Sequence, residues 1–262
     1  MAQTQPTFAG DASAPPAVSK TNGKIELLGG SLDNDSAAAL AGSLTAPLGH
    51  AFGVQVDGLA GNLDGNGTWG LGTYLFWRNP ERGLLGLTAS RNRLNDRDAD
   101  RVGLEAEGYF DRFTLGAVVG RQSGDVKDGA YLGLSGSYYL NDNLMIQGAG
   151  QAIDGDHLYA LGAEWQPASV HEGLAFFANA TSGDGDAVDS ALLGVRLYFG
   201  GSKSLKQRHR EDDPVNPLFN SLMGTANGLK GCSGGNTTRI NGGYIEVVDC
   251  NGNVISRTPN EV

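Results

Sequence analysis

The sequence predicts an all-β fold, in which about twelve antiparallel strands form an up-and-down barrel followed by a small C-terminal extension. Apolar and polar residues alternate through most of the chain, the alternating segments are similar in length, and turn-forming residues separate them. Alternation indicates strands, because successive side chains of a strand point to opposite faces of the sheet. Almost no segment shows the helical period, so little helix is expected.

The composition narrows the class of protein. The chain has 262 residues, with 41 glycines, 9 prolines and a formal net charge of −10. Glycine without a Gly-X-Y repeat argues against collagen. The acidic excess argues against a nucleic-acid partner, because proteins that neutralise phosphates carry clustered Lys and Arg. No apolar run is long enough for a membrane-spanning helix, whereas a membrane β-barrel stays compatible, since its alternating strands do not raise the average hydropathy.

The predicted strands follow one another along the chain. The pattern is clearest at residues 191–199, where Ala191, Leu193, Val195, Leu197 and Phe199 share one face. Similar alternation places the strands at 24–30, 36–46, 51–61, 68–78, 84–92, 101–110, 113–122, 129–140, 143–152, 157–165, 173–181 and 190–199. Most of these segments have the length of a tilted strand that crosses a bilayer, about 9–11 residues. Their number is even, as in bacterial single-chain barrels.

Two kinds of connection alternate between the strands. One kind is short, and its members lie at 47–50, 79–83, 111–112, 141–143 and 166–172. Each connection of the other kind carries Asp, and together they contain Asp33, Asp35, Asp64, Asp96, Asp98, Asp100, Asp125, Asp128, Asp154, Asp156, Asp184, Asp186 and Asp189. In an up-and-down topology the two kinds lie at opposite ends, so the sequence predicts an acidic rim at one end.

Aromatic residues on the apolar face gather near the short connections. They are Phe52, Trp77, Phe110, Phe113, Tyr138, Trp165, Phe176 and Phe199. Aromatic rings settle at the headgroup level of a membrane, whereas a soluble barrel has no reason to gather outward aromatics at one level. We therefore expect the apolar face to meet lipid and the aromatics to lie at the membrane interface.

The strand number, the alternating connections, the aromatic girdle and the last strand resemble a bacterial outer-membrane β-barrel of the porin-like kind, over residues 24–199. The resemblance implies a Gram-negative outer membrane, with both termini periplasmic and the acidic loops outside. It also implies lipids, lipopolysaccharide and the barrel-insertion machinery as partners. The apolar series that ends at Phe199 is similar to the terminal-strand insertion signal, although 63 further residues follow it.

Two other interpretations are open. A soluble barrel would place the apolar face inside, and alternation alone does not distinguish inside from outside. A calcium-binding repeat protein would explain acidic pairs such as Asp154-Gly155-Asp156, because calcium prefers oxygen ligands. Asp and Gly are also the ordinary residues of tight turns, and no regular ligand repeat appears, so turn chemistry is the favoured explanation and no metal site is predicted.

The other strand face is expected to line a lumen. The predicted pore-lining residues are Lys24, Glu26, Asp57, Tyr74, Glu105, Glu107, Tyr109, Tyr131, Gln147, Gln151, Glu164 and Arg196. Their carboxylates outnumber their cations, so we expect a narrow, cation-preferring diffusion channel for small solutes. An equally weighted interpretation pairs these carboxylates with Lys24 and Arg196 in a closed structural network. The alternative function is a structural or interaction barrel whose acidic rim or tail binds partners.

No catalytic motif is readable, so an enzyme is not expected and no cofactor is predicted. The four histidines, His50, His157, His171 and His209, are interpreted as solvated polar residues. A barrel hydrolase would need a serine, a histidine and an orienting partner on one wall. A homo-oligomer is left open.

The predicted organisation has four parts: a disordered lead-in at 1–23, the barrel at 24–200, a linker at 201–230 and a small hairpin module at 231–262. Within the module, Asn241-Gly242 between two β-favouring segments predicts a hairpin. Cys232 and Cys250, the two cysteines of the chain, flank it. Outside the cytoplasm such a pair predicts a disulfide, and the stapled module is expected to contact peptidoglycan, a periplasmic protein or the barrel.

Overall fold

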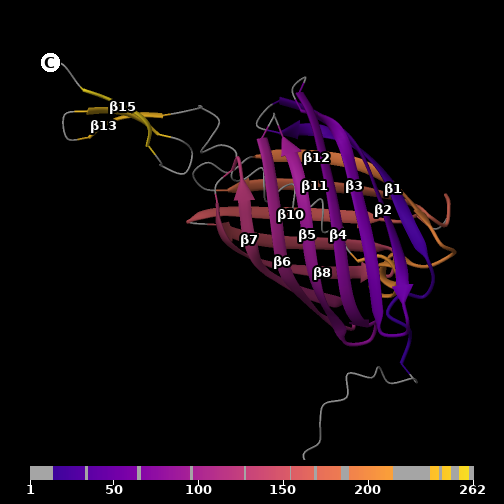
Figure 1. Ribbon diagram of the computed structural model, residues 1–262. Helices are drawn as coiled ribbons and strands as arrows, with labels where there is room; N and C mark the ends of the chain where they lie inside the picture. The colour runs from indigo at the N-terminus through magenta and orange to yellow at the C-terminus, as the bar shows by residue number, and fades with distance from the viewer. Residues whose placement is uncertain are drawn as a thin grey trace, which may run out of the picture.

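The protein is a closed antiparallel β-barrel of twelve strands, β1 to β12 (Figure 1). The computed structural model describes residues 14–32, 35–63, 66–94, 97–126, 128–153, 155–167, 170–183, 189–214, 237–241, 244–248 and 254–259. The barrel strands are β1 (Asn22–Leu32), β2 (Asp35–Leu48), β3 (Phe52–Leu63), β4 (Asn66–Asn79), β5 (Gly83–Leu94), β6 (Arg97–Phe110), β7 (Phe113–Gly124), β8 (Gly129–Asn141), β9 (Leu144–Ile153), β10 (Asp156–Trp165), β11 (Leu174–Gly183) and β12 (Ser190–Phe199).

Each strand pairs with its neighbours in the sequence, and β1 closes the barrel by pairing with β12. In this last pairing Lys24 lies opposite Tyr198 and Glu26 lies opposite Arg196. The prediction of a twelve-stranded up-and-down barrel is confirmed. Several strands are longer than predicted, because ladder hydrogen bonds continue into polar residues beyond the apolar alternation.

The outward face of the barrel is apolar in every strand. One strongly exposed apolar side chain from each strand, in chain order, is Leu27, Leu40, Val56, Leu75, Leu87, Leu104, Leu115, Leu134, Ile146, Leu161, Phe176 and Leu193. Their neighbours in sequence point inward, since the side-chain period of a strand is two residues. The apolar side chains therefore point out of the barrel, and the soluble-barrel interpretation, which places them inside, is wrong.

The inward face is not entirely polar. Leu28, Leu59, Phe177 and Leu192 form the centre of a buried apolar cluster inside the barrel. These residues come from β1, β3, β11 and β12. The sequence analysis expected mainly polar residues on this face. The cluster fills part of the interior and narrows the space that is left for water.

The two ends of the barrel differ in their connections. We call the end with the short connections, at 49–51, 80–82, 111–112, 142–143 and 166–173, the turn end, and the opposite end the loop end. Both segments that flank the barrel in sequence lie against the turn end. Residues 14–21 form one of them, in which Ala17 and Val18 are buried. We call these residues the strap.

The second flanking segment contains a single helical turn, α1 (Leu205–Gln207), which continues into a π-helical turn, η1 (Arg208–Asp212). Ser204 caps α1, since its hydroxyl accepts a hydrogen bond from the Gln207 amide. Leu205, Arg208, Asp212 and Asp213 are buried. The sequence analysis expected a linker here, whereas the structure packs residues 203–213, which we call the plug, against the barrel interior.

A separate antiparallel sheet contains β13 (Thr237–Asn241), β14 (Tyr244–Val248) and β15 (Val254–Pro259). The predicted hairpin is confirmed as β13 and β14, with Asn241 still in β13 and paired with Tyr244, so that the connection lies one residue later than predicted. β15 adds a strand that the sequence analysis did not predict. Cys232 and Cys250 lie outside the described residues. In the described part of the chain, no helix has the length and apolar character that crossing a membrane requires.

Candidate functional site: the lumen and its plug

All twelve predicted pore-lining residues lie on the inward face of the barrel. Eight of them are buried: Lys24, Glu26, Asp57, Tyr74, Tyr109, Tyr131, Glu164 and Arg196. Four are half-buried: Glu105, Glu107, Gln147 and Gln151. Their placement follows from the strand alternation, which puts them opposite the apolar outward residues. That they line a conducting pore stays a prediction.

Arg196 is the centre of a buried charge cluster near the turn end. Its Nε lies 3.1 Å from Oε1 of Glu26, and its Nη1 forms a close ion pair with Oε2 of Glu164. Its guanidinium also lies over the ring of Phe177, 4.7 Å from the ring centroid. The guanidinium neutralises both carboxylates, whereas an unpaired charge buried in the low-dielectric interior would cost several kcal/mol of stability.

Lys24 joins this cluster to the plug. Its Nζ lies 3.9 Å from Oε1 of Glu26 and 2.9 Å from Oδ2 of Asp213. The other oxygen of Asp213 accepts a hydrogen bond from the Thr45 hydroxyl at 3.3 Å. The closed network that the sequence analysis weighed against a pore is therefore present for Lys24, Glu26, Glu164 and Arg196, with Asp213 as an additional partner.

His209 lies between two tyrosines of the barrel wall. The Tyr139 hydroxyl is 3.0 Å from Nδ1 of His209, and the Tyr198 hydroxyl is 3.2 Å from Nε2. Tyr198 donates its own hydrogen to Glu164 at 2.7 Å. Nε2 of His209 is therefore the donor to Tyr198, and Nδ1 accepts from Tyr139. The interpretation of His209 as a solvated residue is wrong, because this side chain is 5% exposed.

Arg78 holds the strap and the plug together from β4. Its Nε donates to the Ala17 carbonyl at 2.6 Å, and its Nη2 donates to the Asp212 carbonyl at 2.8 Å. The strap also meets the plug directly, since the Ser19 amide donates to the Glu211 carbonyl at 2.9 Å. One buried guanidinium of the wall therefore fixes two segments that lie far apart in the sequence.

Other plug residues bind the rim of the turn end. Arg210 donates to the Phe113 carbonyl at 2.8 Å, and Arg208 donates to the Glu172 carbonyl at 2.8 Å. Lys206 forms an ion pair of 3.2 Å with Asp142. Two of these contacts use main-chain acceptors, and the third uses the carboxylate of Asp142.

The middle of the lumen is more open than the turn end. Glu105 of β6 is half-buried there. Glu107, nearer the turn end of the same strand, is also half-buried, and its Oε2 accepts a hydrogen bond of 2.9 Å from the Tyr109 hydroxyl. On β8 and β9, which follow β7 along the same wall, Ser135 is exposed and Gln147 is half-buried. Polar side chains that keep this much exposure inside a barrel indicate space for water.

Nearer the loop end, Arg101 lies across the ring of Tyr131, 3.8 Å from the centroid, and donates to Gln151 at 2.9 Å. Outside the lumen at the same end, Arg91 pairs with Asp98 at 2.9 Å. Several of the Asp residues of the predicted rim lie outside the described residues, so the rim as a whole stays a prediction. Among the described residues, no group of three or more His, Cys, Asp and Glu side chains could hold a metal ion.

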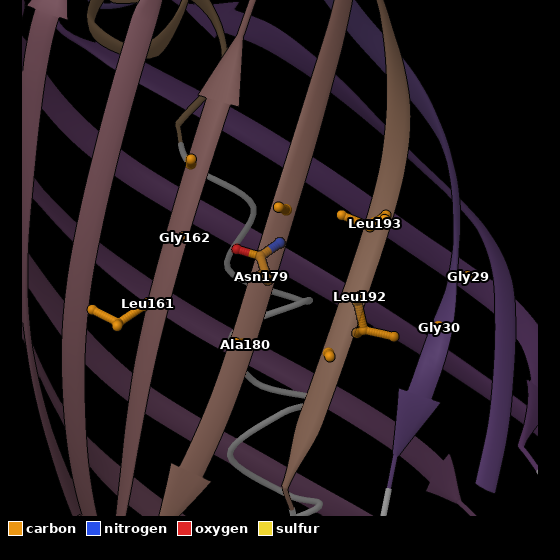
Figure 2. A pocket seen from close by; sticks show the side chains of 11 residues that line it. Gly29, Gly30, Leu161, Gly162, Asn179, Ala180, Leu192 and Leu193 are labelled. Atoms are coloured by element: carbon orange, nitrogen blue, oxygen red, sulfur yellow. The ribbon is translucent and has the colours of Figure 1, made fainter. Parts of the chain in front are cut away.

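A hollow of about 550 Å³ lies across the wall formed by β10, β11, β12 and β1 (Figure 2). Its lining is mostly apolar and contains small residues such as Ala178 and Ala191, with Leu161 and Leu193 beside them. Leu161 and Leu193 are strongly exposed and belong to the outward face. The hollow therefore does not belong to the polar lumen and is not a candidate path for a polar solute.

The predicted interface aromatics lie at the turn end, on the outward face. Phe52 lies opposite Trp77, and Phe110 lies opposite Phe113. Ring contacts join Phe113 to Tyr138, with centroids 4.7 Å apart, and Trp165 to Phe176, with centroids 6.2 Å apart. Phe199 is the last residue of β12. Their role at a membrane interface stays a prediction.

Sequence reasoning missed the plug and its anchors, namely Arg78, Arg208, His209, Arg210, Asp212 and Asp213. Local sequence carries no signal for them, because a charged run, here basic and then acidic, normally indicates a solvated segment. Burial becomes favourable only when distant strands supply the opposite charges and acceptors.

A closed twelve-stranded barrel with an apolar outer wall and polar groups inside has the fold of porin-like outer-membrane β-barrels. Among solved structures, the chain is similar to a KdgM porin in complex with disordered oligogalacturonate, with a TM-score of 0.53 and 10% sequence identity, covering 68% of this chain and 99% of that chain. It is also similar to a NanC porin, with a TM-score of 0.51 and 5% identity, covering 68% of this chain and 100% of that chain. At these identities the likeness shows the fold alone.

Outer membrane phospholipase A from Escherichia coli is a weaker match, with a TM-score of 0.48 and 12% identity over 74% of this chain and 95% of that chain. No inference about activity follows from that likeness. No family model matches the sequence, and no curated protein matches it.

Proposed function

We propose that the protein is an outer-membrane channel for the passive diffusion of small hydrophilic solutes, with a preference for cations. The observation that carries the proposal is the contrast between the apolar outward face of every strand and the half-buried polar groups in the middle of the lumen. The likeness in fold to porins supports it. Glu105 and Glu107 supply the preference, because carboxylates raise the local concentration of cations.

Conductance across a planar bilayer in asymmetric KCl tests this function. We expect a reversal potential of the sign that cation preference produces. Glu105→Gln/Glu107→Gln should shift it towards zero, whereas Glu81→Gln/Asp111→Asn, which removes two exposed charges of the short connections, should leave it unchanged. An anion preference in the unmodified chain would contradict the selectivity, and the absence of current from a folded chain that lacks the plug would contradict the channel.

A structural or interaction barrel is the second candidate, and the packing of the turn end favours it. The plug and the strap occupy this end, and Arg196, Glu26 and Glu164 form a paired cluster beneath them. In this alternative the barrel anchors the C-terminal sheet, which recruits peptidoglycan or a periplasmic protein. The membrane partners would be the same, namely lipids, lipopolysaccharide and the insertion machinery, and both termini would be periplasmic.

We further propose that Cys232 and Cys250 form a disulfide beside the β13–β14 hairpin. Thr237 lies opposite Val248 in that hairpin, so its two ends, which lead to the cysteines, are held together. A disulfide of this loop length typically stabilises a small module by about 2–4 kcal/mol. Mass spectrometry of the non-reduced chain after thiol alkylation should find no alkylated cysteine; two alkylated cysteines would show that the bridge is absent.

A further inference from the structure

The plug links the last barrel strand to the C-terminal sheet and has little apolar character of its own. Residues 203–213 contain Lys203, Lys206, Arg208 and Arg210 against Glu211, Asp212 and Asp213, and Leu205 is the one aliphatic residue. Such a segment cannot be held by hydrophobic burial alone. Its position therefore depends on polar contacts with the barrel.

These contacts come from strands on all sides of the lumen. Lys24 of β1 binds Asp213 at 2.9 Å, and Arg78 of β4 binds the Asp212 carbonyl at 2.8 Å. Tyr139 of β8 and Tyr198 of β12, the strand next to β1, bind the two nitrogens of His209 at 3.0 and 3.2 Å. The plug therefore spans the opening and does not lie along one wall.

Burial of the wall beneath the plug shows that the turn end is sealed. Thr45 and Gln55 are fully buried there, and Tyr139 is 1% exposed, although all three belong to the inward face. In the middle of the lumen Ser135 is exposed and Gln147 is half-buried. At the turn end the buried groups contact the plug directly, since the Thr45 hydroxyl binds Asp213 and the Tyr139 hydroxyl binds His209. Inward groups nearer the loop end, such as Asn92 and Gln122, are buried as well.

Most contacts that hold the plug are hydrogen bonds and ion pairs, which hydrogen bonds to water can replace. Carbonyls, carboxylates and guanidinium groups that separate on release regain hydrogen bonds to solvent, so the net contribution of each contact is modest. By contrast, the barrel is held by continuous ladders between all twelve strands. Release of the plug would therefore break none of the ladders that hold the barrel.

We propose that residues 203–213 are a gate that closes the turn end of the channel and opens by leaving the lumen as a unit, an inference that rests on the proposed channel function. The strap is the latch of this gate, because Ser19 binds Asp212 and the Ser19 amide binds the Glu211 carbonyl. Lys203, which binds Asp212 at 2.7 Å, lies at the hinge next to the barrel.

Thiol accessibility tests the seal independently of conduction. Both test variants are made in a Cys232→Ser/Cys250→Ser background. Ser43→Cys places a thiol beneath the plug, because the native Ser43 hydroxyl lies 3.4 Å from Oδ1 of Asp213. Ser36→Cys places a thiol at the exposed loop end of the same strand. With the plug present, a charged thiol reagent should modify the cysteine at position 43 at least about a hundredfold more slowly than the cysteine at position 36, because position 43 reacts only while the plug is in its minor open state. Replacing 203–213 by eleven Gly and Ser residues should bring the two rates within about tenfold. Equally slow modification of position 43 in the folded replacement variant would overturn the seal.

A reversible cross-link tests the gate without removing any part of the chain. Thr45→Cys/Asp213→Cys joins the plug to β2, at positions whose side chains are 3.3 Å apart. The matched control, Thr45→Cys/Gln55→Cys, joins β2 to β3 and leaves the plug free. In the same cysteine-free background, oxidation should abolish current in the first variant only, and reduction should restore it.

The outcomes separate the gate from the channel. Current through the oxidised Thr45→Cys/Asp213→Cys variant equal to that of its reduced form would overturn the gate and leave the channel intact. Absence of current from both the reduced variant and the folded plug replacement would overturn the channel. If no current is found, position 43 can still react faster in the plug replacement than in the variant that keeps the plug. That result would show that the plug seals a barrel that does not conduct.

Discussion

At the scale of single residues, Arg196 and its two carboxylates show how a charged interior is kept folded. Glu26 and Glu164 are 1% and 4% exposed, so neither carboxylate is solvated by bulk water. Arg196 lies between them, and the pairing of β1 with β12 sets this geometry by placing Glu26 opposite Arg196. The Arg196–Glu26 ion pair is thus a consequence of barrel closure, whereas Glu164 lies on β10, two strands from Arg196.

Replacing Arg196 by Met should lower the free energy of unfolding by about 3–5 kcal/mol, because two buried carboxylates lose their cation. Urea titration in detergent micelles, followed by tryptophan fluorescence, measures the change. The triple variant Glu26→Gln/Arg196→Met/Glu164→Gln, which removes the charges together, should recover most of the loss. A triple variant no more stable than the single one would contradict the charge argument.

Glycines of the inward face allow aromatic rings to lie flat on the wall. Phe177 lies directly opposite Gly194, and a methyl group at Gly194 would lie 2.2 Å from Cζ of Phe177. Tyr131 has the same relation to Gly120, with 2.5 Å to its Cζ. Part of the high glycine content therefore serves ring packing in the lumen.

Gly194→Ala should displace Phe177 and lower the free energy of unfolding by about 1–3 kcal/mol, since the ring must move to accommodate the methyl group. Gly136→Ala is the matched control on the outward face, where the nearest atom is Cδ2 of Leu115 at 3.6 Å. The same urea titration compares the two. Equal changes would show that ring packing is not the cause.

At the scale of elements, the proposed membrane location makes the cost of a charged substitution on the apolar outward face depend on its depth. In β8, Leu134 lies near the middle of the strand and Leu140 lies near the turn end, and both are exposed outward. Leu134 and Leu140 are therefore two outward leucines of one strand that differ in depth.

Leu134→Arg should lower the free energy of unfolding in phospholipid vesicles by about 2–4 kcal/mol, and Leu140→Arg should lower it by about 0–1 kcal/mol, because the cost of a cation falls towards the interface. Chemical denaturation of the reconstituted barrel measures both values. If the two substitutions cost the same, the middle of β8 does not lie at the centre of the bilayer.

The plug is the element for which local sequence and structure disagree most. The alternation that predicts the barrel strands depends on side-chain direction alone and is readable within each segment. Residues 203–213 have no such period, and their burial depends on Lys24, Arg78, Tyr139 and Tyr198, which lie on four different strands. Interpreting the run as a linker followed from its charges, and the correction comes from partners that the sequence does not place.

At the scale of the whole molecule, closure decides which residues meet. β1 pairs with β12 although their sequences are separated by the rest of the barrel. Closure removes both sheet edges and places β1 beside β12. The even number of up-and-down strands puts the strap and the plug at the same end. The turn end therefore receives both flanking segments, whereas the loop end receives the Asp-bearing connections.

The sequence by itself determined the number and order of the barrel strands, the apolar face of each strand, the two kinds of connection and the hairpin of β13 and β14. These features follow from the two-residue period of a strand and from turn chemistry, which act over a few residues. Only the tertiary structure decided the apolar cluster around Phe177, the position of His209 and the sealing of the turn end by residues 203–213. Each of these depends on contacts across the lumen, and a charge or a ring is buried only where distant strands supply its partner.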